Sequence, residues 1–188
     1  GAGDKVAILS QSMPNWSVAF FSLVPFGRIA IPILPDSSEN EVTNILNHSE
    51  SKVIFVSQKL ASKVSQECRD KMTLVIDLDT FEVLQCDDEK FTCDGKTAVP
   101  TPDDIATIIY TSGTTGLSKG VMLSEHNLVS CVKYGLQVAH YYDKTLSVLP
   151  YHHSYEAVAG ILVAIHRHAT YCINDSLKRI VKNLALYQ

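Results

Sequence analysis

The sequence predicts an α/β protein: a mainly parallel β-sheet, in one or more parts, with helices on both faces. Short runs rich in β-branched and aliphatic residues alternate along the chain with longer segments of helical periodicity. The chain has 188 residues, 46% of them hydrophobic and 19% charged, so a sizeable core can form. Strands that alternate with helices are joined by right-handed crossovers, and both faces of the resulting sheet are covered.

The first strand and the first helix follow from local signals. Lys5–Leu9 is a short β-rich run, and a helix is predicted over Pro14–Phe26, with proline in its first turn and Gly27 at its end. Val18–Leu34 is apolar enough to suggest a membrane span, but it contains Arg28, which costs about 2.5–3.5 kcal/mol at the centre of a span. A buried helix followed by a buried strand is the better interpretation.

A second strand and a second helix come next. Ala30–Leu34 predicts the strand, and Pro32 within it indicates an edge or irregular position. Ser38–His48 carries apolar residues on one helical face, and Ser37 or Ser38 is the expected N-cap. Both elements continue the alternation of strand and helix.

The rest of the chain repeats this rhythm around one irregular connection. Asp79–Asp104 is acidic and rich in turn residues, so we expect a boundary there between sub-lobes of approximately 1–100 and 101–188. A short apolar run, Val121–Leu123, follows the fifth strand. The remaining predictions are strands at Lys52–Ser57, Leu74–Leu78, Ile105–Tyr110, Thr145–Leu149 and Ala169–Ile173, and helices at Gln58–Cys68, Ser124–Tyr141, Tyr155–Arg167 and Ser176–Tyr187.

Composition excludes several classes of protein. The net charge is −4 and the basic residues are scattered, whereas nucleic-acid binding needs a clustered positive face. The five cysteines form no C-x-x-C pair, so neither a zinc site nor a disulfide framework is favoured. The N-terminus lacks the features of a signal peptide. We therefore expect a cytoplasmic protein with reduced thiols and no transmembrane segment.

The segment Tyr110–Gly120, with the sequence YTSGTTGLSKG, carries the strongest chemical signal. Its glycines let backbone N–H groups approach an anion, its hydroxyls are further donors, and Lys119 adds a positive charge. These features indicate a phosphate cradle. A Walker loop is excluded because Ser118, not glycine, precedes the lysine, and no G-x-G-x-x-G occurs in the chain. An ordinary polar loop between a strand and a helix is the remaining alternative.

This segment resembles the signature phosphate loop of the adenylate-forming family, which includes acyl-CoA synthetases, peptide-synthetase adenylation domains and firefly luciferase. The signature is roughly [Y/L]-T-S-G-T-T-G-x-P-K-G, and the chain departs from it at Ser118, where proline is usual. The resemblance implies that the loop holds the β- and γ-phosphates of ATP. The binding residues that it implies are Thr111, Ser112, Gly113, Thr114, Thr115, Gly116 and Lys119.

A second segment, Leu149–Glu156, has the sequence LPYHHSYE and follows a predicted strand. Because ligands bind at the carboxyl ends of parallel strands, we expect it at the same sheet edge as the phosphate loop. It resembles a second signature of the family, in the form of long-chain fatty acyl-CoA synthetases. The resemblance implies His153 as a catalytic residue beside the carboxylate and α-phosphate, and Tyr155 in the acyl pocket.

The alternative for this segment is a plain strand-to-helix turn, with Glu156 near the positive end of the next helix. A metal site is not favoured, because H-H-x-x-E differs from the zinc-binding H-E-x-x-H pattern. We expect no protein-held metal within the chain.

The resemblance implies a reaction in two steps. A fatty carboxylate attacks the α-phosphate of Mg-ATP to give acyl-AMP and pyrophosphate, and the thiol of CoA then displaces AMP. Most Mg²⁺ ligands and the other catalytic groups of the family lie in downstream segments, so residues 1–188 are expected to be part of the large adenylation domain and inactive alone. Other acids, such as aryl or amino acids, a non-catalytic nucleotide- or phosphate-binding module, and a structural domain remain alternatives, and a homo-oligomer is compatible with all of them.

Overall fold

The computed structural model describes residues 1–91, 98–111, 118–138, 140–174 and 176–187. The strands are β1 (Lys5–Leu9), β2 (Ile29–Ile33), β3 (Val53–Val56), β4 (Leu74–Asp77), β5 (Val83–Cys86), β6 (Ile105–Thr111), β7 (Lys119–Ser124), β8 (Lys144–Ser147) and β9 (Thr170–Ile173). The helical elements are α1 (Pro14–Leu23), η1 (Val24–Phe26), α2 (Glu39–Ser49), η2 (Gln58–Lys63), α3 (Gln66–Asp70), α4 (Glu125–Val138), η3 (Glu156–Leu162), α5 (Val163–His166), η4 (Leu177–Arg179) and α6 (Ile180–Leu186).

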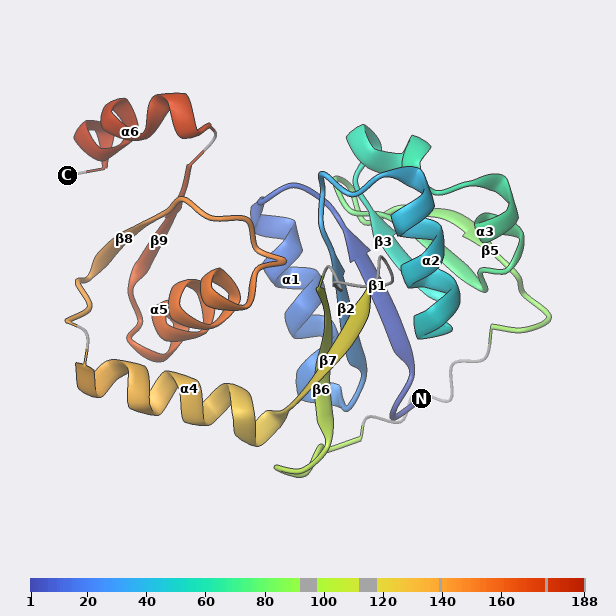
Figure 1. Cartoon of the computed structure of the whole chain (residues 1–188), viewed down its shortest axis with the longest axis horizontal. Helices are drawn as coiled ribbons and strands as arrows, with labels where there is room; N and C mark the ends of the chain where they lie inside the picture. Colours follow the sequence, from blue (N-terminus) through green and yellow to red (C-terminus); the bar gives the residue numbers. More distant parts are fainter. Residues whose placement is uncertain (92–97, 112–117, 139, 175, 188) are drawn as a thin grey trace.

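The described strands form two sheets. A seven-stranded sheet has the order β5-β4-β3-β1-β2-β6-β7, and its five inner strands are parallel (Figure 1). The outermost strands, β5 and β7, run antiparallel to their neighbours. A separate sheet consists of the parallel pair β8 and β9. The predicted fold class, a mainly parallel sheet with helices on both faces, is confirmed.

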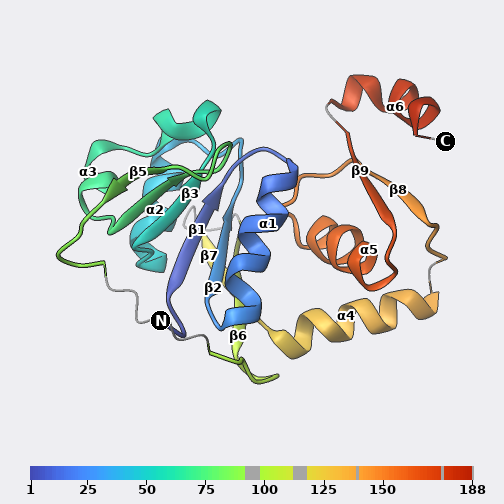
Figure 2. The same ribbon diagram turned by 180° about the vertical axis from the view of Figure 1, so that it is seen from behind.

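The large sheet is buried on both faces at β1. Successive side chains of this strand point to opposite faces, and a hydrophobic cluster covers each face. Val6 and Ile8 belong to a hydrophobic cluster with α1, whereas Ala7 and Leu9 belong to a second cluster with α2. Figures 1 and 2, which view the molecule from opposite sides, show α1 and α2 on opposite faces of the sheet. The apolar segment that suggested a membrane span forms α1, η1 and β2 in this core, as expected.

Of the two positions expected for Pro32, an edge or an irregular one, the edge position is wrong. Its strand, β2, lies inside the sheet between β1 and β6. The pairing of β2 with β6 contains a single register pair, Ala30 with Thr107, and the Thr107 hydroxyl also donates to the carbonyl of Ala30 at 2.8 Å. A proline has no N–H for a ladder, so a short pairing on that side accommodates Pro32 inside a sheet.

Two strands were not predicted. Within the connection Asp79–Asp104, β5 adds to β4 in antiparallel direction. The apolar run Val121–Leu123 lies in β7, which pairs antiparallel with β6. The glycine-rich segment therefore joins two strands of a hairpin, not a strand and a helix. Strands from both sides of residue 100 share the large sheet, and the division into sub-lobes stays a prediction.

Predicted helix ends are mostly confirmed, and four predicted helices each divide into two helical elements. Ser38 accepts from the backbone N–H of Glu41, whose carboxylate accepts from the backbone of Ser38, which completes a capping box at α2. Gln58–Cys68 divides into η2 and α3. Tyr155–Arg167 begins as a π-helical turn, η3, before α5, and π-helical turns are frequent at functional sites.

A buried carboxylate ends β4 and ties it to η2. Asp77 is 3% exposed; Gln58 Nε2 donates to its Oδ2 at 2.6 Å, and the backbone N–H of Asp79 donates to its Oδ1 at 2.8 Å. The hydrogen bond from Gln58, followed by that from Asp79, lowers the pKa of Asp77. A carboxyl group with a lowered folded-state pKa stabilises the fold above its unfolded pKa, and this contribution is lost as the pH falls through the folded pKa.

We predict that Asp77→Asn lowers the free energy of unfolding at pH 7 by about 1–3 kcal/mol, because hydrogen bonds to a charged acceptor are lost. The difference from the wild-type chain should shrink progressively below about pH 4, because the unfolded state takes up a proton there while the folded state, with its lowered pKa, stays ionised to a lower pH. Urea unfolding at pH 7 and pH 3 measures this difference, with Glu82→Gln, an exposed acid in the turn before β5, as the control. An equal difference at both pH values contradicts the prediction.

Candidate functional site

Two described residues of the segment predicted to bind phosphate, Thr111 and Lys119, lie at the end of the β6–β7 hairpin. Thr111 pairs with Lys119, and Tyr110 pairs with Gly120. Directly opposed residues of antiparallel strands share a face, so the exposed Thr111 and Lys119 project on one face, and Tyr110 and Gly120 lie on the other. The remaining predicted residues, Ser112, Gly113, Thr114, Thr115 and Gly116, lie outside the described residues.

The face that carries Lys119 can be identified from its neighbours on β7. Leu123, four residues along the strand and therefore on the same face, packs against the cluster that contains Trp16 and Tyr151. Tyr110, on the opposite face, packs against the cluster of α2. The Lys119 ammonium and the Thr111 hydroxyl thus share a sheet face with Tyr151. Tyr151 is the first residue of the turn Tyr151–His153, which we call the His-His turn.

The expectation that the two segments follow strands of one sheet edge is wrong, because β8 belongs to the separate two-stranded sheet. The His-His turn nevertheless packs at the carboxyl end of β1 in the large sheet. The backbone N–H of Tyr151 donates to Ser12 Oγ at 3.3 Å, and the Tyr151 ring meets Trp16 edge-on at 5.6 Å between centroids. Tertiary packing, not strand pairing, brings the turn to the carboxyl-end side of the sheet, where parallel sheets bind ligands.

The two histidines of this turn have different environments. Burial, followed by the neighbouring His153, lowers the pKa of His152 to about 4, although Asp36 after β2 opposes the shift. His152 is therefore neutral at pH 7, and its buried Nδ1 has no hydrogen-bond partner among the described residues. His153 is exposed, and its Nδ1 accepts from the backbone N–H of Tyr155 at 3.2 Å. Tyr155 itself is 64% exposed.

A polar cluster that the sequence did not reveal lies next to this turn, where the rings of Tyr151 and Tyr171 are in contact. Glu156, 5% exposed, accepts a hydrogen bond from the Tyr171 hydroxyl, and the Tyr141 hydroxyl donates to the carbonyl of Gly160 at 3.0 Å. Burial and the bond to Glu156 raise the pKa of Tyr171. These contacts tie η3 to β9 and to the chain after α4. The residues of this cluster come from η3, from β9 and from the chain after α4. No sequence motif links residues this far apart, so the cluster could not have been predicted from the sequence.

The Tyr151 hydroxyl lies close to this cluster without completing it. Burial raises the pKa of Tyr151 to about 12, and the Ser147 and Tyr171 hydroxyls are near enough to oppose that shift. The Tyr151 Oη still makes no hydrogen bond of ordinary geometry to a described residue. The turn therefore presents two buried polar atoms, Tyr151 Oη and His152 Nδ1, with unused bonding capacity.

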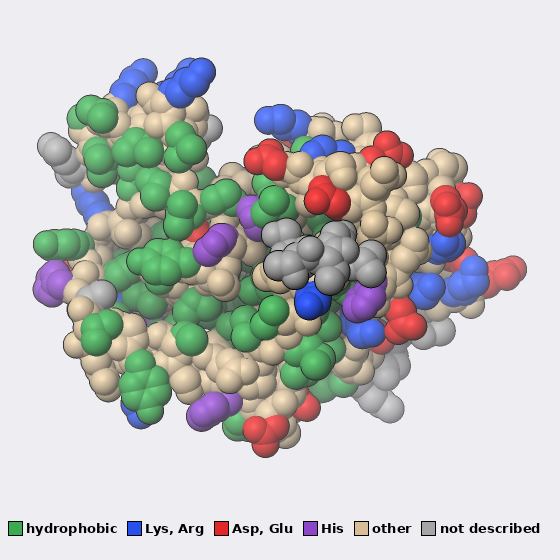
Figure 3. Space-filling model, viewed as in Figure 1, with side chains coloured by type: hydrophobic (Ala, Val, Ile, Leu, Met, Phe, Trp, Pro, Cys, Tyr) green, Lys and Arg blue, Asp and Glu red, His purple; other side chains and the backbone are tan. Residues whose placement is uncertain are grey.

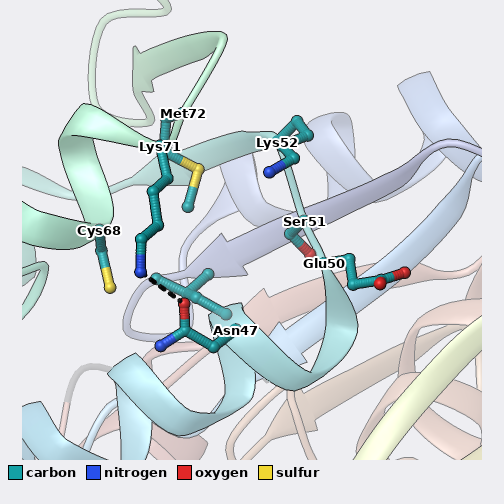
Figure 4. Close-up of a pocket in the computed structure, with 8 residues that line it drawn as sticks. Asn47, Glu50, Ser51, Lys52, Cys68, Lys71 and Met72 are labelled. Atoms are coloured by element: carbon teal, nitrogen blue, oxygen red, sulfur yellow. Dashed lines mark hydrogen bonds between the residues drawn. The ribbon is translucent and has the colours of Figure 1, made fainter.

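A separate cavity of about 350 Å³ lies at the amino ends of β3 and β4 (Figure 4). Lys71 Nζ, which lines it, donates to Asn47 Oδ1 at 3.4 Å and pairs with Glu67 at 2.7 Å. Its positive charge is thus already balanced. Parallel sheets bind ligands at the carboxyl ends of their strands, so this cavity is not the candidate site. It is lined by Leu46, Asn47, Glu50, Ser51, Lys52, Cys68, Lys71 and Met72.

The donor set at the hairpin end suits a phosphate group. An exposed ammonium and an exposed hydroxyl on one face are ordinary phosphate donors. Within the described ranges, no group of three or more His, Cys, Asp or Glu could hold a metal ion. No helix in the described part of the chain is long and apolar enough to cross a bilayer.

Comparison with known proteins agrees with the resemblance found in the sequence. The profile of the AMP-binding enzyme family matches residues 1–186. A long-chain-fatty-acid–CoA ligase of Mycobacterium bovis is 27% identical over 202 aligned residues, which cover 100% of this chain and 34% of that protein. An oxalate–CoA ligase of Arabidopsis thaliana is 30% identical, over 87% of this chain and 33% of that protein.

Solved structures agree on the fold. The ATP-bound structure of MatB from Rhodopseudomonas palustris superposes with a TM-score of 0.78 and 21% identity, covering 100% of this chain and 39% of that one. The chain spans about a third of the length of the curated relatives that it matches. Since the family profile covers nearly every residue, this chain belongs to the AMP-binding enzyme family.

Proposed function

We propose that this chain supplies the phosphate-binding hairpin and part of the acyl site of an ATP-dependent acyl-CoA synthetase. The observation that carries the proposal is the placement of Lys119 and Thr111 on the sheet face against which the Tyr151–His153 turn packs. The relatives named above are CoA ligases for a fatty acid and for oxalate. Carboxylate activation by ATP is the chemistry that these segments suit.

The hairpin end would bind the β- and γ-phosphates of ATP. Lys119 provides charge, Thr111 provides a hydroxyl, and we assign the same role to Ser112, Gly113, Thr114, Thr115 and Gly116. Hydrogen bonds to charged groups contribute about 1.5–3 kcal/mol each. We propose Mg-ATP as the nucleotide, with most Mg²⁺ ligands outside this chain. Catalysis needs alignment and charge stabilisation here, because no side chain has to act as a nucleophile.

The His-His turn would bind the carboxylate. His153 is exposed, and the backbone N–H of Tyr155 holds its Nδ1, so its other ring nitrogen is the one that would reach the carboxylate and the α-phosphate. Tyr155 would line the acyl pocket. The neutral, buried His152 supports the turn. We propose a long-chain fatty acid as the substrate and CoA as the second acceptor.

The described surface fits a chain that needs further protein for turnover. Large hydrophobic side chains lie exposed in the C-terminal half, among them Val138 at 88%, Val181 at 82% and Tyr142 at 71%. On the face drawn in Figure 3, hydrophobic side chains gather over the C-terminal half, whereas most acidic side chains lie over the N-terminal half. Exposed apolar patches of this kind mark interaction sites. We propose that the other part of an adenylation domain covers them.

A non-catalytic phosphate-binding module is the second candidate. The exposed cation and hydroxyl at the hairpin end would serve it equally well. Such a module binds ATP without a requirement for any carboxylate. A panel of fatty, aryl and amino acids in an ATP–pyrophosphate exchange assay, run on a longer protein that contains this chain, distinguishes the two functions.

The first prediction from this proposal is that the 188-residue chain alone forms no acyl-AMP. Groups that hold adenine, ribose and Mg²⁺ are proposed to lie elsewhere, so fatty-acid-dependent ATP–pyrophosphate exchange should not exceed that of the Lys119→Ala chain. Exchange clearly above this control shows that the chain is catalytically complete.

The second prediction is that Lys119→Ala, in a longer protein that contains the chain, lowers kcat/KM for ATP in the exchange reaction by about 10- to 100-fold. That range corresponds to the loss of one hydrogen bond to a charged group. Lys133→Ala, which removes an exposed lysine from α4, is the matched control. Exchange kinetics unchanged by Lys119→Ala remove this residue from its proposed role.

The third prediction is that His153→Ala in the same protein lowers kcat/KM for the fatty acid about tenfold, while the KM for ATP stays within about twofold. The selective effect follows because His153 is proposed to contact the carboxylate and not the outer phosphates. His166→Ala, an exposed histidine at the end of α5, is the control. Equal losses for both substrates argue against a carboxylate contact.

A further inference from the structure

A tyrosine–histidine contact joins the hairpin to α2 on the face opposite Lys119. His48, in the last turn of α2, has its Nδ1 at 2.8 Å from the Tyr110 hydroxyl. The two rings also meet edge-to-face, with 5.7 Å between their centroids. The contact joins residues 62 positions apart in sequence. His48 lies outside the site described above, and Tyr110 is not among the proposed phosphate-binding residues.

Tyr110 lies directly behind the phosphate donors. It precedes Thr111 on β6, and it pairs across the hairpin with Gly120, which follows Lys119. A Cβ on Gly120 would lie 3.4 Å from Tyr110 Cζ and 2.8 Å from Ile108 Cγ2. The tyrosine ring therefore rests against the bare backbone of Gly120, so its position constrains both strands next to the two donors.

The other end of the contact is anchored. The apolar face of α2, formed by Val42, Ile45 and Leu46, is buried against the large sheet, and the capping box fixes its first turn. Burial raises the pKa of the Tyr110 hydroxyl. The hydroxyl thus keeps its proton at neutral pH and can donate to the imidazole. A docked helix holds the ring through one hydrogen bond and one ring contact.

We infer that His48 is a positioning residue for phosphate binding: its bond to Tyr110 holds the β6–β7 hairpin so that Thr111 and Lys119 face the same phosphate groups. His48 does not itself touch the nucleotide. The inference rests on the proposed function, because a positioning role needs a ligand at the hairpin end. A preorganised pair of donors binds more tightly than a mobile pair, since less ordering accompanies binding.

Four variants, made in a longer protein that contains this chain, separate this role from simple structural support. His48→Ala removes both contacts, and Tyr110→Phe removes the hydroxyl but keeps the ring over Gly120. His48→Asn keeps a hydrogen-bonding group near the place of Nδ1. The double variant His48→Ala/Tyr110→Phe tests whether the two residues act as one unit.

The experiment measures the binding of inorganic tripolyphosphate and of Mg-ATP by calorimetry, with thermal unfolding of each variant alongside. We expect His48→Ala and Tyr110→Phe each to weaken binding of both ligands about fivefold, and the double variant to be no weaker. His48→Asn should restore most of the affinity. A support role alone would lower the unfolding temperature without such selective rescue. Lys119→Ala is the control for the binding site itself.

Each outcome decides one of the two claims. If Lys119→Ala abolishes binding but the His48 and Tyr110 variants bind like the wild type, the positioning role is overturned and the proposed function stands. Independent, additive losses, or an asparagine variant as weak as the alanine variant, also overturn the positioning role. A wild-type form of that longer protein that binds neither ligand, or whose binding ignores Lys119→Ala, overturns the proposed function and with it this inference.

Discussion

The antiparallel pairing of β6 with β7 is the constraint on which the candidate site depends. Its register opposes Thr111 to Lys119 and Tyr110 to Gly120, and in such a pair the side chains of opposed residues share a face. One register thus gives the hairpin a donor face and an anchoring face. A slip of β7 by one residue against β6 would move Lys119 to the face of Tyr110, placing the ammonium against α2 and away from the Thr111 hydroxyl.

The hairpin lies at one edge of the large sheet, so β7 has a neighbour among the described strands on one side only. Inner strands such as β1 are buried on both faces by the clusters of α1 and α2, whereas β7 is an edge strand and two of its apolar residues, Val121 and Met122, are largely exposed. An edge strand has fewer neighbours to hold it. The contacts of Tyr110 with α2 and of Leu123 with the α1 cluster therefore matter more for this strand than they would in the sheet centre.

The sequence predicted the fold well where local signals and tertiary structure agreed. Pro14, Gly27 and Ser38 mark helix ends in the structure as their types indicate. The prediction from sequence failed where pairing between distant strands determines the structure. The apolar run Val121–Leu123, for example, is too short for its periodicity to identify a strand. The edge alternative for Pro32 failed because a proline inside a sheet requires only that one partner strand pair over a short length. No local sequence pattern indicates how long a partner strand pairs.

The candidate site shows the same division between local and tertiary information. Motif spacing singled out Lys119 and His153, because their neighbours in sequence carry the signal. Spacing could not indicate His48, whose partner Tyr110 is 62 residues away, or Glu156 in η3, whose partner Tyr171 lies in β9. Both contacts hold backbone elements behind exposed polar residues. Motifs thus identify the groups that face a ligand, while the groups that hold them in place become visible only once the chain is folded.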